Sequence, residues 1–316
     1  MRPTCLVVGA TGGIGRSVVK YLLEEDCNVK VLVRDKEKAG KYFSQFAEVE
    51  IIFGDAANKT DVARAAEETT HLFYCLNIPY PDWNKKAREL LKISVDAAKT
   101  NEAKFVFPGN VYVYGHAESN PVNENHPHKA HTSKGKIRIE MEELIKSSGV
   151  NWTIIRFPDF YGPYVVNGFS EMLYLNSLSG KPLKWIGETN LPIEYIYIED
   201  AGNAMVVAGL SSKSDKQEYN VPANEKVSNK EYLTKISKLG GKNSGQQIFN
   251  SPLLFKLLGI FNKQIKEVDE MMYLKREELF LDGTKFLNTF GFLPSTTIDD
   301  GINKTFDWVK SFYRIN

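Results

Sequence analysis

The sequence predicts an α/β fold, a doubly wound parallel sheet followed by a smaller C-terminal lobe. Apolar runs of strand length alternate with helical patterns along the first half of the chain, which is typical of a parallel sheet covered by helices on both faces. A glycine-rich turn joins the first of these runs to the first amphipathic stretch. With 316 residues and 42% hydrophobic content, the chain can bury a large core in one or two lobes.

The expected strands are six apolar runs. They are Cys5–Val8, Val29–Val33, Val49–Phe53, His71–Leu76, Lys104–Phe107 and Trp152–Phe157. Between them, the stretches from Asn84 to Thr100 and from Ser133 to Ser147 place apolar residues at the three-to-four spacing of one buried helix face.

The pattern loosens after about Pro163 into shorter elements. A helix is expected from Asp200 to Leu210, and a helix-rich tail from Ser228 onward. We therefore expect residues 1–163, with a later contribution from about 195–212, to form the first lobe, and residues 164–316 to form the smaller one.

The turn after the first strand has the composition of a dinucleotide-binding loop of the Rossmann type. Its glycines allow a sharp turn, let backbone N–H groups approach a pyrophosphate, and let the helix pack on the strand. A diphosphate then lies at the positive N-terminus of the helix. The alternative is a structural turn without a ligand. The residues expected to bind the diphosphate are Gly9, Thr11, Gly12, Gly13, Ile14 and Gly15.

Two positions at the ends of the next strands bear on which dinucleotide binds. Arg34 stands where a carboxylate ordinarily accepts the hydrogen bonds of an unmodified adenosine ribose. Arginine cannot accept these bonds, but its planar fork matches a phosphate, so the sequence favours NADP over NAD unless Arg34 is simply exposed. After the third strand, Asp55 either accepts the adenine amino group or belongs to a turn-forming Gly54-Asp55 pair.

The composition argues against several classes of partner. The formal net charge is +1, which gives no electrostatic preference for nucleic acid or anionic lipid. No stretch approaches the roughly 20 apolar residues of a membrane span, and no signal peptide is recognisable. The three cysteines, Cys5, Cys27 and Cys75, cannot form a paired framework and fit buried positions in a reducing compartment. We expect a cytoplasmic protein.

A set of motifs spread over nearly the whole chain occurs together. They are Gly9–Gly15, Gly54-Asp55, Val113–Gly115, Lys136 with Glu140, Arg156 with Tyr161–Pro163, and Tyr197–Ala201. Together they resemble the extended short-chain dehydrogenase/reductase family of NAD-dependent epimerases and dehydratases. The segments Asn110–Gly115, Lys134–Arg138 and Asp159–Pro163 look most like a poorly characterised branch described as nucleoside-diphosphate-sugar epimerase-like.

The resemblance implies a first lobe that binds the dinucleotide and a second lobe that closes over a substrate, often a nucleotide-sugar. It places Asn77 near the cofactor after the fourth strand, Lys136 on the nicotinamide ribose, and Phe157 and Pro158 along the nicotinamide.

The same resemblance raises a question about catalysis. In this family a tyrosine and a lysine four residues apart on one helix face carry the acid–base chemistry, opposite a serine or threonine. Lys136 aligns with the lysine, but the tyrosine position falls on Thr132 and the serine position on Gly109-Asn110. An aliphatic hydroxyl cannot replace a phenolate because its proton is too weakly acidic. The acid–base work has therefore moved to another group or has been lost.

Four residues are candidates for the moved chemistry. Tyr112 follows the fifth strand, at the edge where ligands bind in open parallel sheets. His131 directly precedes Thr132 and titrates near neutrality, and Asp159 is a base if it faces the nicotinamide. Asn110 is placed to hydrogen-bond a substrate carbonyl in place of the missing serine. The structural alternatives are packing for Tyr112, solvation for His131 and a turn or helix cap for Asp159.

Two further clusters of side chains occur in the sequence. Four histidines lie close together with one glutamate, but they lack the helical spacing of metal ligands and fall in a loop, so no metal site is expected. These residues are His116, His126, His128, His131 and Glu124. The aromatic run Tyr80–Trp83 either walls the substrate cleft above Asn77 or fixes the entry of the next helix as an apolar staple.

These features predict an NADP-binding protein of the epimerase, dehydratase or reductase type, acting by hydride transfer on a small or nucleotide-linked carbonyl or sugar substrate. The alternative is a non-catalytic NADP-binding protein with a redox-sensing or scaffold role, as in atypical family members that lack the tyrosine. We expect no nucleic-acid or membrane partner. A homodimer through the helices Asn84–Thr100 and Ser133–Ser147 fits the habit of the family.

Overall fold

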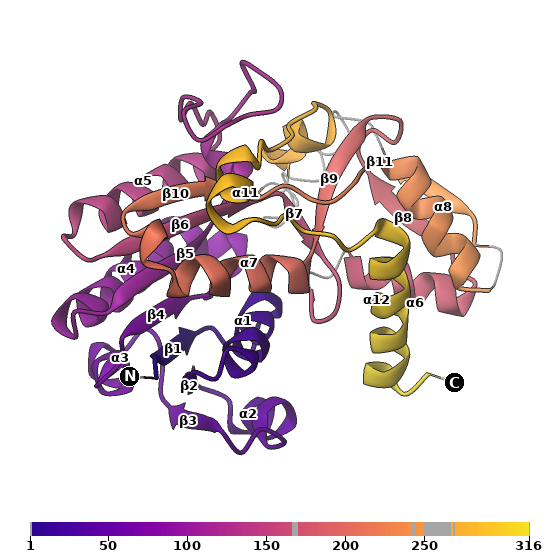
Figure 1. The fold of residues 1–316 in the computed structure, drawn as a ribbon. Helices are drawn as coiled ribbons and strands as arrows, with labels where there is room; N and C mark the ends of the chain where they lie inside the picture. Colours follow the sequence, from indigo (N-terminus) through magenta and orange to yellow (C-terminus); the bar gives the residue numbers. More distant parts are fainter. Residues whose placement is uncertain (1, 166–169, 242–243, 250–266, 268, 316) are drawn as a thin grey trace.

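The computed structural model describes residues 2–165, 170–241, 244–249, 267 and 269–315. Its largest layer is a seven-stranded sheet in the order β10-β6-β5-β4-β1-β2-β3, in which every neighbouring pair is parallel (Figure 1). Strand order reverses between β1 and β4, which makes this the switch point where doubly wound sheets bind ligands. The strands are β1 (Thr4–Val8), β2 (Asn28–Val33), β3 (Val49–Phe53), β4 (His71–Tyr74), β5 (Lys104–Asn110), β6 (Trp152–Phe157) and β10 (Gln217–Asn220).

Helices cover both faces of this sheet because successive strand residues point to opposite sides. Cys5 and Val7 of β1 belong to one core, and Leu6 and Val8 to the other. The first core includes α1 (Gly13–Glu24), α2 (Lys36–Phe43) and α7 (Ile198–Leu210). The second includes α3 (Lys59–Ala66), α4 (Tyr80–Thr100) and α5 (Ser133–Ser147). The doubly wound fold expected from the sequence is confirmed.

A second lobe has its own core, in which Trp185, Tyr232 and Phe306 are buried. Its strands form a three-stranded sheet of β7 (Asp159–Tyr161), β9 (Pro192–Tyr197) and β11 (Lys226–Ser228), and a parallel pair of β8 (Leu183–Ile186) and β12 (Gln246–Phe249). Its helices are α6 (Ser170–Ser179), α8 (Asn229–Leu239) and α12 (Ile298–Tyr313), which stand together on the side of the molecule away from β1 to β4 (Figure 1).

The two lobes interleave along the chain. The strand β10 completes the main sheet, and α11 (Thr284–Phe290) packs Phe286 against Tyr219 of that strand. The sequence pattern does not predict β10, because half of this short strand is the polar pair Gln217-Glu218. The first lobe therefore takes up more of the later chain than residues 195–212, whereas β9 lies in the sheet of the second lobe.

Three short 3₁₀ helices complete the described elements. They are η1 (Val111–Val113), η2 (Ser212–Ser214) and η3 (Met272–Lys275). Within the described ranges, no helix combines the length and the apolar character needed to cross a membrane.

Candidate functional site

The loop between β1 and α1 depends on its glycines. Gly9 has a φ of +86°, and a Cβ there would lie 2.5 Å from the backbone nitrogen of Leu76. A Cβ on Gly15 would collide with the carbonyl oxygen of Gly9, so only glycine allows α1 to approach the strand this closely. Gly12 is the N-cap of α1 and offers no side chain to the first-turn amides. These amides remain available to an anion such as a diphosphate.

The other loop residues expected at the diphosphate are Thr11, Gly13 and Ile14. All three are partly buried, and Ile14 packs against the core of the first lobe. A Cβ on Gly13 would lie 3.1 Å from the carbonyl oxygen of Tyr164, so the start of the second lobe lies directly over this loop.

Arg34 and Asp55 lie together at the ends of β2 and β3. Arg34 Nη1 is 3.6 Å from Asp55 Oδ2, and the Arg34 side chain is 80% exposed. Asp55 Oδ1 accepts a hydrogen bond from the Ala57 N–H at 2.9 Å, so one carboxylate oxygen belongs to the turn. The guanidinium of Arg34 is thus open to a ligand, whereas Asp55 already has local partners.

Two tyrosine hydroxyls meet at the same sheet edge as the glycine loop. Tyr112 lies in η1 directly after β5, Tyr80 begins α4 after β4, and their hydroxyl oxygens are 2.9 Å apart. Asn110 caps η1, its Oδ1 accepting a hydrogen bond from the Tyr112 N–H at 3.1 Å. Asn77 is exposed on the connection between β4 and α4.

Both phenols of this pair are held in the protonated form. Burial raises the pKa of Tyr112 well above its ordinary value, and the neighbouring Tyr80 and Asp159 add to the effect. Burial also raises the pKa of Tyr80. The charge of Arg138 lowers both pKa values but is outweighed. At neutral pH the pair can therefore donate protons but does not act as a ready phenolate.

Of the two roles expected for the aromatic run at the start of α4, the contacts support the one at the helix entry. The Trp83 ring is buried, packs edge-on against Tyr80 at 5.3 Å, and donates a hydrogen bond to the Ile78 carbonyl. Trp83 thus fixes the entry of the helix, while Tyr80 reaches Tyr112.

The N-terminus of α5 places Thr132 and Lys136 in different environments. Thr132 is the N-cap, 5% exposed, and its Oγ1 accepts a hydrogen bond from the Gly135 N–H at 3.1 Å. The Lys136 N–H bonds the Thr132 carbonyl at 3.0 Å, but the residue as a whole is exposed. The pair that the family resemblance places on one helix face, Thr132 and Lys136, is thus a buried cap and an exposed residue.

Lys134 is the buried lysine of this helix start. Its side chain is 3% exposed and forms ion pairs with Glu267 and Glu270, the latter at 2.8 Å. Glu270 also accepts hydrogen bonds from the backbone N–H groups of Ser133 and Lys134 at 3.0 and 3.2 Å. The Lys134 ammonium lies 5.7 Å from the Tyr80 ring centroid. The late chain therefore supplies acidic groups to this sheet edge, which no local sequence signal indicates.

Asp159 at the start of β7 forms an ion pair with Lys275, a residue that the sequence analysis did not single out. Its Oδ2 lies 2.7 Å from the Nζ of Lys275, which also donates to the Tyr195 hydroxyl at 3.3 Å. Burial disfavours the charged form of Lys275, but Asp159 and Tyr195 outweigh it and raise its pKa above the ordinary value. Asp159 is thus the partner of a cation rather than an unpaired base.

The two residues expected beside the nicotinamide are both buried. Phe157 is fully buried in the core of the first lobe, with its ring centroid 5.6 Å from that of Phe160. Pro158 follows it at the end of β6 and is also buried. Both residues are thus part of the buried packing at the carboxyl end of β6.

The histidines are distributed among separate contacts. His131 stacks on His116 with ring centroids 4.0 Å apart, and His116 Nδ1 lies 2.7 Å from Glu277. Burial lowers the pKa of His131, with His116 adding to the effect, so this imidazole is neutral at pH 7. His126 instead accepts the Glu118 N–H at 2.9 Å.

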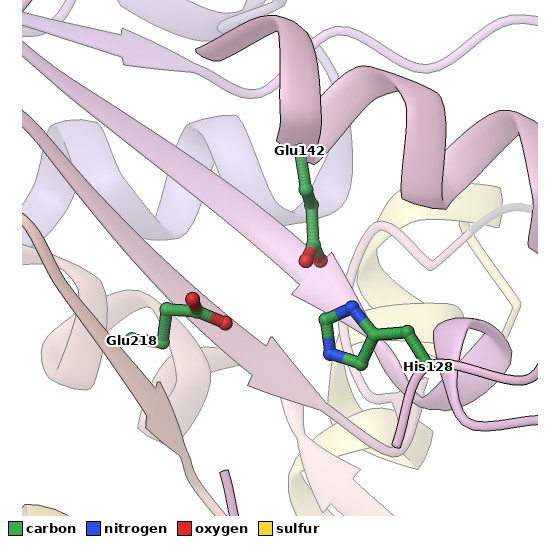
Figure 2. Close-up of side chains that lie close together, drawn as sticks. All are labelled: His128, Glu142 and Glu218. Carbon is green, nitrogen blue, oxygen red and sulfur yellow. The ribbon is translucent and has the colours of Figure 1, made fainter. Parts of the chain in front are cut away.

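His128 points toward Glu142 and Glu218 (Figure 2), and the potential ligand atoms lie within 4.8 Å of one another. The fully buried Arg156 already binds both carboxylates: its Nε donates to Glu142 at 3.1 Å, and Nη2 contacts Glu218. Lys146 also pairs with Glu218. Two cations thus compensate the two carboxylates, which leaves little net charge to attract a divalent ion. We interpret the cluster as a buried ion-pair network.

The chain is similar to an NAD(P)H-binding family and to several curated proteins. Residues 9–162 match the NAD(P)H-binding family. The chain is 21% identical to a chloroplast stem-loop binding protein of 41 kDa from Arabidopsis thaliana, over 96% of this chain and 78% of the relative. It is 24% identical to a UDP-glucose 4-epimerase of Vibrio cholerae, over 96% of this chain and 95% of the relative.

A solved structure shows the same architecture over nearly the whole chain. A UDP-glucuronic acid 4-epimerase from Bacillus cereus, crystallised in complex with NAD, superimposes with a TM-score of 0.82 and 20% identity, covering 98% of this chain and 99% of that one. The chain thus has the fold of this UDP-glucuronic acid 4-epimerase, and residues 9–162 are similar to the NAD(P)H-binding family.

Proposed function

We propose that this protein is an NAD(P)-dependent enzyme that transfers a hydride to or from a small or nucleotide-linked carbonyl or sugar substrate, with Tyr112 as the proton donor. The observation that carries this proposal is the Tyr80–Tyr112 hydroxyl pair, which lies on the same sheet edge as the glycine loop. The epimerases among the similar proteins support the substrate class.

The residues of the first lobe fit a dinucleotide. Glycine at positions 9 and 15 lets the loop and α1 pack where any Cβ would collide with backbone, and the uncapped start of α1 leaves its first amides for an anion. When bound, the nicotinamide supplies hydride transfer. Arg34 would hold a 2′-phosphate, which favours NADP, although the B. cereus structure contains NAD. Asp55, Asn77 and Lys136 remain proposals for the adenine and ribose ends.

The tyrosine pair suits the reduction of a carbonyl. When a carbonyl carbon accepts a hydride, the oxygen becomes an alkoxide that needs one proton. Tyr112 is neutral and can give its hydroxyl proton to that oxygen. The charge of Arg138, which lowers the pKa of Tyr112, then stabilises the phenolate that is left. Asn110 is proposed to orient the substrate carbonyl through its side-chain N–H₂ group, since its Oδ1 caps η1.

A second candidate is a non-catalytic NAD(P)-binding protein with a redox-sensing or scaffold role. The Thr132 hydroxyl caps α5, and Lys136 is exposed. Lys134 is paired with two carboxylates. The start of α5 therefore holds no phenolate–ammonium pair. This reading requires dinucleotide binding without turnover.

The first experiment measures binding and turnover together. Calorimetry with NADPH and NADH establishes the cofactor. The loss of reduced-dinucleotide absorbance is then followed with diketones, quinones and 4-keto nucleotide sugars as substrates. We expect Tyr112→Phe to lower turnover by about a hundredfold or more while leaving cofactor affinity unchanged. Tyr313→Phe, at an exposed position on α12, is the matched control.

Different outcomes separate the candidates. Binding without turnover on any substrate favours the non-catalytic role. Turnover that survives Tyr112→Phe rejects Tyr112 as the proton donor. A titration with a stem-loop RNA checks the expectation of no nucleic-acid partner, because one relative is named for stem-loop binding. The homodimer and the cytoplasmic location remain predictions.

A further inference from the structure

Arg16 of α1 is enclosed by two aromatic rings from different parts of the chain. Its guanidinium carbon lies 3.9 Å from the ring centroid of Tyr42, near the end of α2, and 3.4 Å from that of Tyr164, at the start of the second lobe. Tyr164 has a φ of +63°, a backbone conformation that costs energy for a residue other than glycine. Its ring is fixed in turn by Trp308 of α12, with centroids 4.9 Å apart. Three elements therefore hold this cation in place.

The guanidinium of Arg16 is not fully satisfied by the protein. Its Nη1 is buried and has no hydrogen-bond partner among the described residues. Burial lowers the pKa of Arg16, and the groups that oppose this effect are the two tyrosines rather than a carboxylate. A partly buried cation with no carboxylate partner among the described residues costs stability, so an anion bound beside it would be favoured.

The position of Arg16 indicates which anion this is. Helical side chains lean toward the helix N-terminus, so Arg16 leans back toward the glycine loop, one turn away. Gly13, three residues earlier on the same face, lies under the Tyr164 backbone, and Arg16 lies under its ring. The first-turn amides of α1, which can bind an anion, and the incompletely bonded guanidinium of Arg16 therefore both lie near Tyr164.

We propose that Arg16 binds the diphosphate of the dinucleotide, and that Tyr42 and Tyr164 hold its guanidinium ready for it. This inference rests on the proposed dinucleotide binding and adds a ligand from outside the glycine motif. It also gives the second lobe a part in cofactor binding, because Tyr164 belongs to the segment that joins the two lobes.

Calorimetry on the full chain tests this assignment with NADP⁺, NAD⁺ and ADP-ribose. Arg16→Met removes the charge, and we expect it to weaken all three ligands by about tenfold or more, because all three carry the diphosphate. Arg16→Lys keeps the charge without the planar fork and should lose less. Arg34→Ala should weaken only NADP⁺. Lys20→Met is the matched control on α1, because Lys20 pairs with Glu199 instead.

The outcomes distinguish this inference from the function on which it depends. If the unmutated protein binds neither dinucleotide, the proposed function fails. If it binds them and folded Arg16→Met binds them equally well, Arg16 only links the lobes and this inference is wrong. A loss confined to NADP⁺ moves Arg16 to the 2′-phosphate and overturns the diphosphate assignment. If Arg16→Met does not fold, Arg16→Lys decides, and full affinity in that variant contradicts the proposal.

Discussion

Glu194 of β9 is a buried carboxyl group with an incomplete set of partners. The residue is 5% exposed, and its Oε2 accepts a hydrogen bond from the Leu281 N–H at 3.0 Å. Oε1 is buried and has no partner within the part of the chain that the structure describes. Burial raises the pKa of Glu194 to about 7, with Leu281 and Lys226 opposing the shift. The neutral acid is therefore the form that the fold prefers.

This shift predicts a pH dependence of stability. Above its ordinary pKa the carboxyl is ionised in the unfolded chain but still protonated in the folded one. The free energy of unfolding should therefore fall as the pH rises from about 4.5 to about 7, by at most about 3 kcal/mol. Glu194→Gln keeps a neutral group and should flatten this part of the profile, so that the variant is the more stable protein at pH 8.

Urea unfolding at a series of pH values measures this effect. Glu50→Gln, at an exposed position on β3, is the control and should leave the profile unchanged. A profile that keeps its slope in Glu194→Gln would show that another group titrates.

At the scale of elements, the start of α5 uses Thr132, a residue expected in catalysis, as its N-cap. A helix begins with amide groups that have no partner within the helix. Thr132 binds one of them, and the Glu270 carboxylate takes two more. Thr297 caps α12 in the same way, accepting the Asp300 N–H at 3.2 Å. The hydroxyl of Thr132 is thus already engaged.

The capping role predicts how Thr132 variants behave. Thr132→Val removes the acceptor and should cost about 1 kcal/mol in stability, as should Thr297→Val at the other cap. Thr132→Ser keeps the oxygen and should cost less. Turnover per folded molecule should be the same in all three variants. A folded Thr132→Val protein that binds cofactor but has lost its activity would instead give the hydroxyl a chemical role.

At the scale of the whole molecule, Arg156 joins elements that are far apart in the sequence. From β6 it binds Glu142 of α5 and Glu218 of β10, and its Nη1 lies 3.4 Å from the Tyr114 hydroxyl. Arg156 and Glu142 are 0% and 1% exposed. The two carboxylates hold the pKa of Arg156 well above its ordinary value, although burial opposes the charge.

Removing one member of this network should be costly, because it leaves a buried charge unpaired. We expect Arg156→Met to lower the free energy of unfolding by about 3–5 kcal/mol, and the double variant Arg156→Met with Glu142→Met to recover much of the loss. Arg88→Met, which breaks the exposed pair with Glu140, should cost less than about 1 kcal/mol. Denaturant midpoints measure all of these variants. A double variant no more stable than the single one would argue against an ion-pair role.

The sequence by itself determined the features that depend on local pattern. Strand and helix periods, and the spacing of the glycines in the first loop, are properties of neighbouring residues. They gave the six expected strands, the glycine loop at Gly9–Gly15 and the α5 range as the structure has them, within a few residues at the ends. The fourth strand ends two residues earlier than expected, and α4 begins four residues earlier, at Tyr80.

The tertiary structure alone decided which side chains meet. Tyr80 and Tyr112, Asp159 and Lys275, and Lys134 and Glu270 are separated by about 30 to 140 residues, and each contact forms only when strand order brings two elements to one edge. Likewise, whether Lys134 or Lys136 is buried depends on what packs against α5, because both residues are compatible with a helix. Pairing across the fold is set by the packing of the whole sheet, and no local period encodes it.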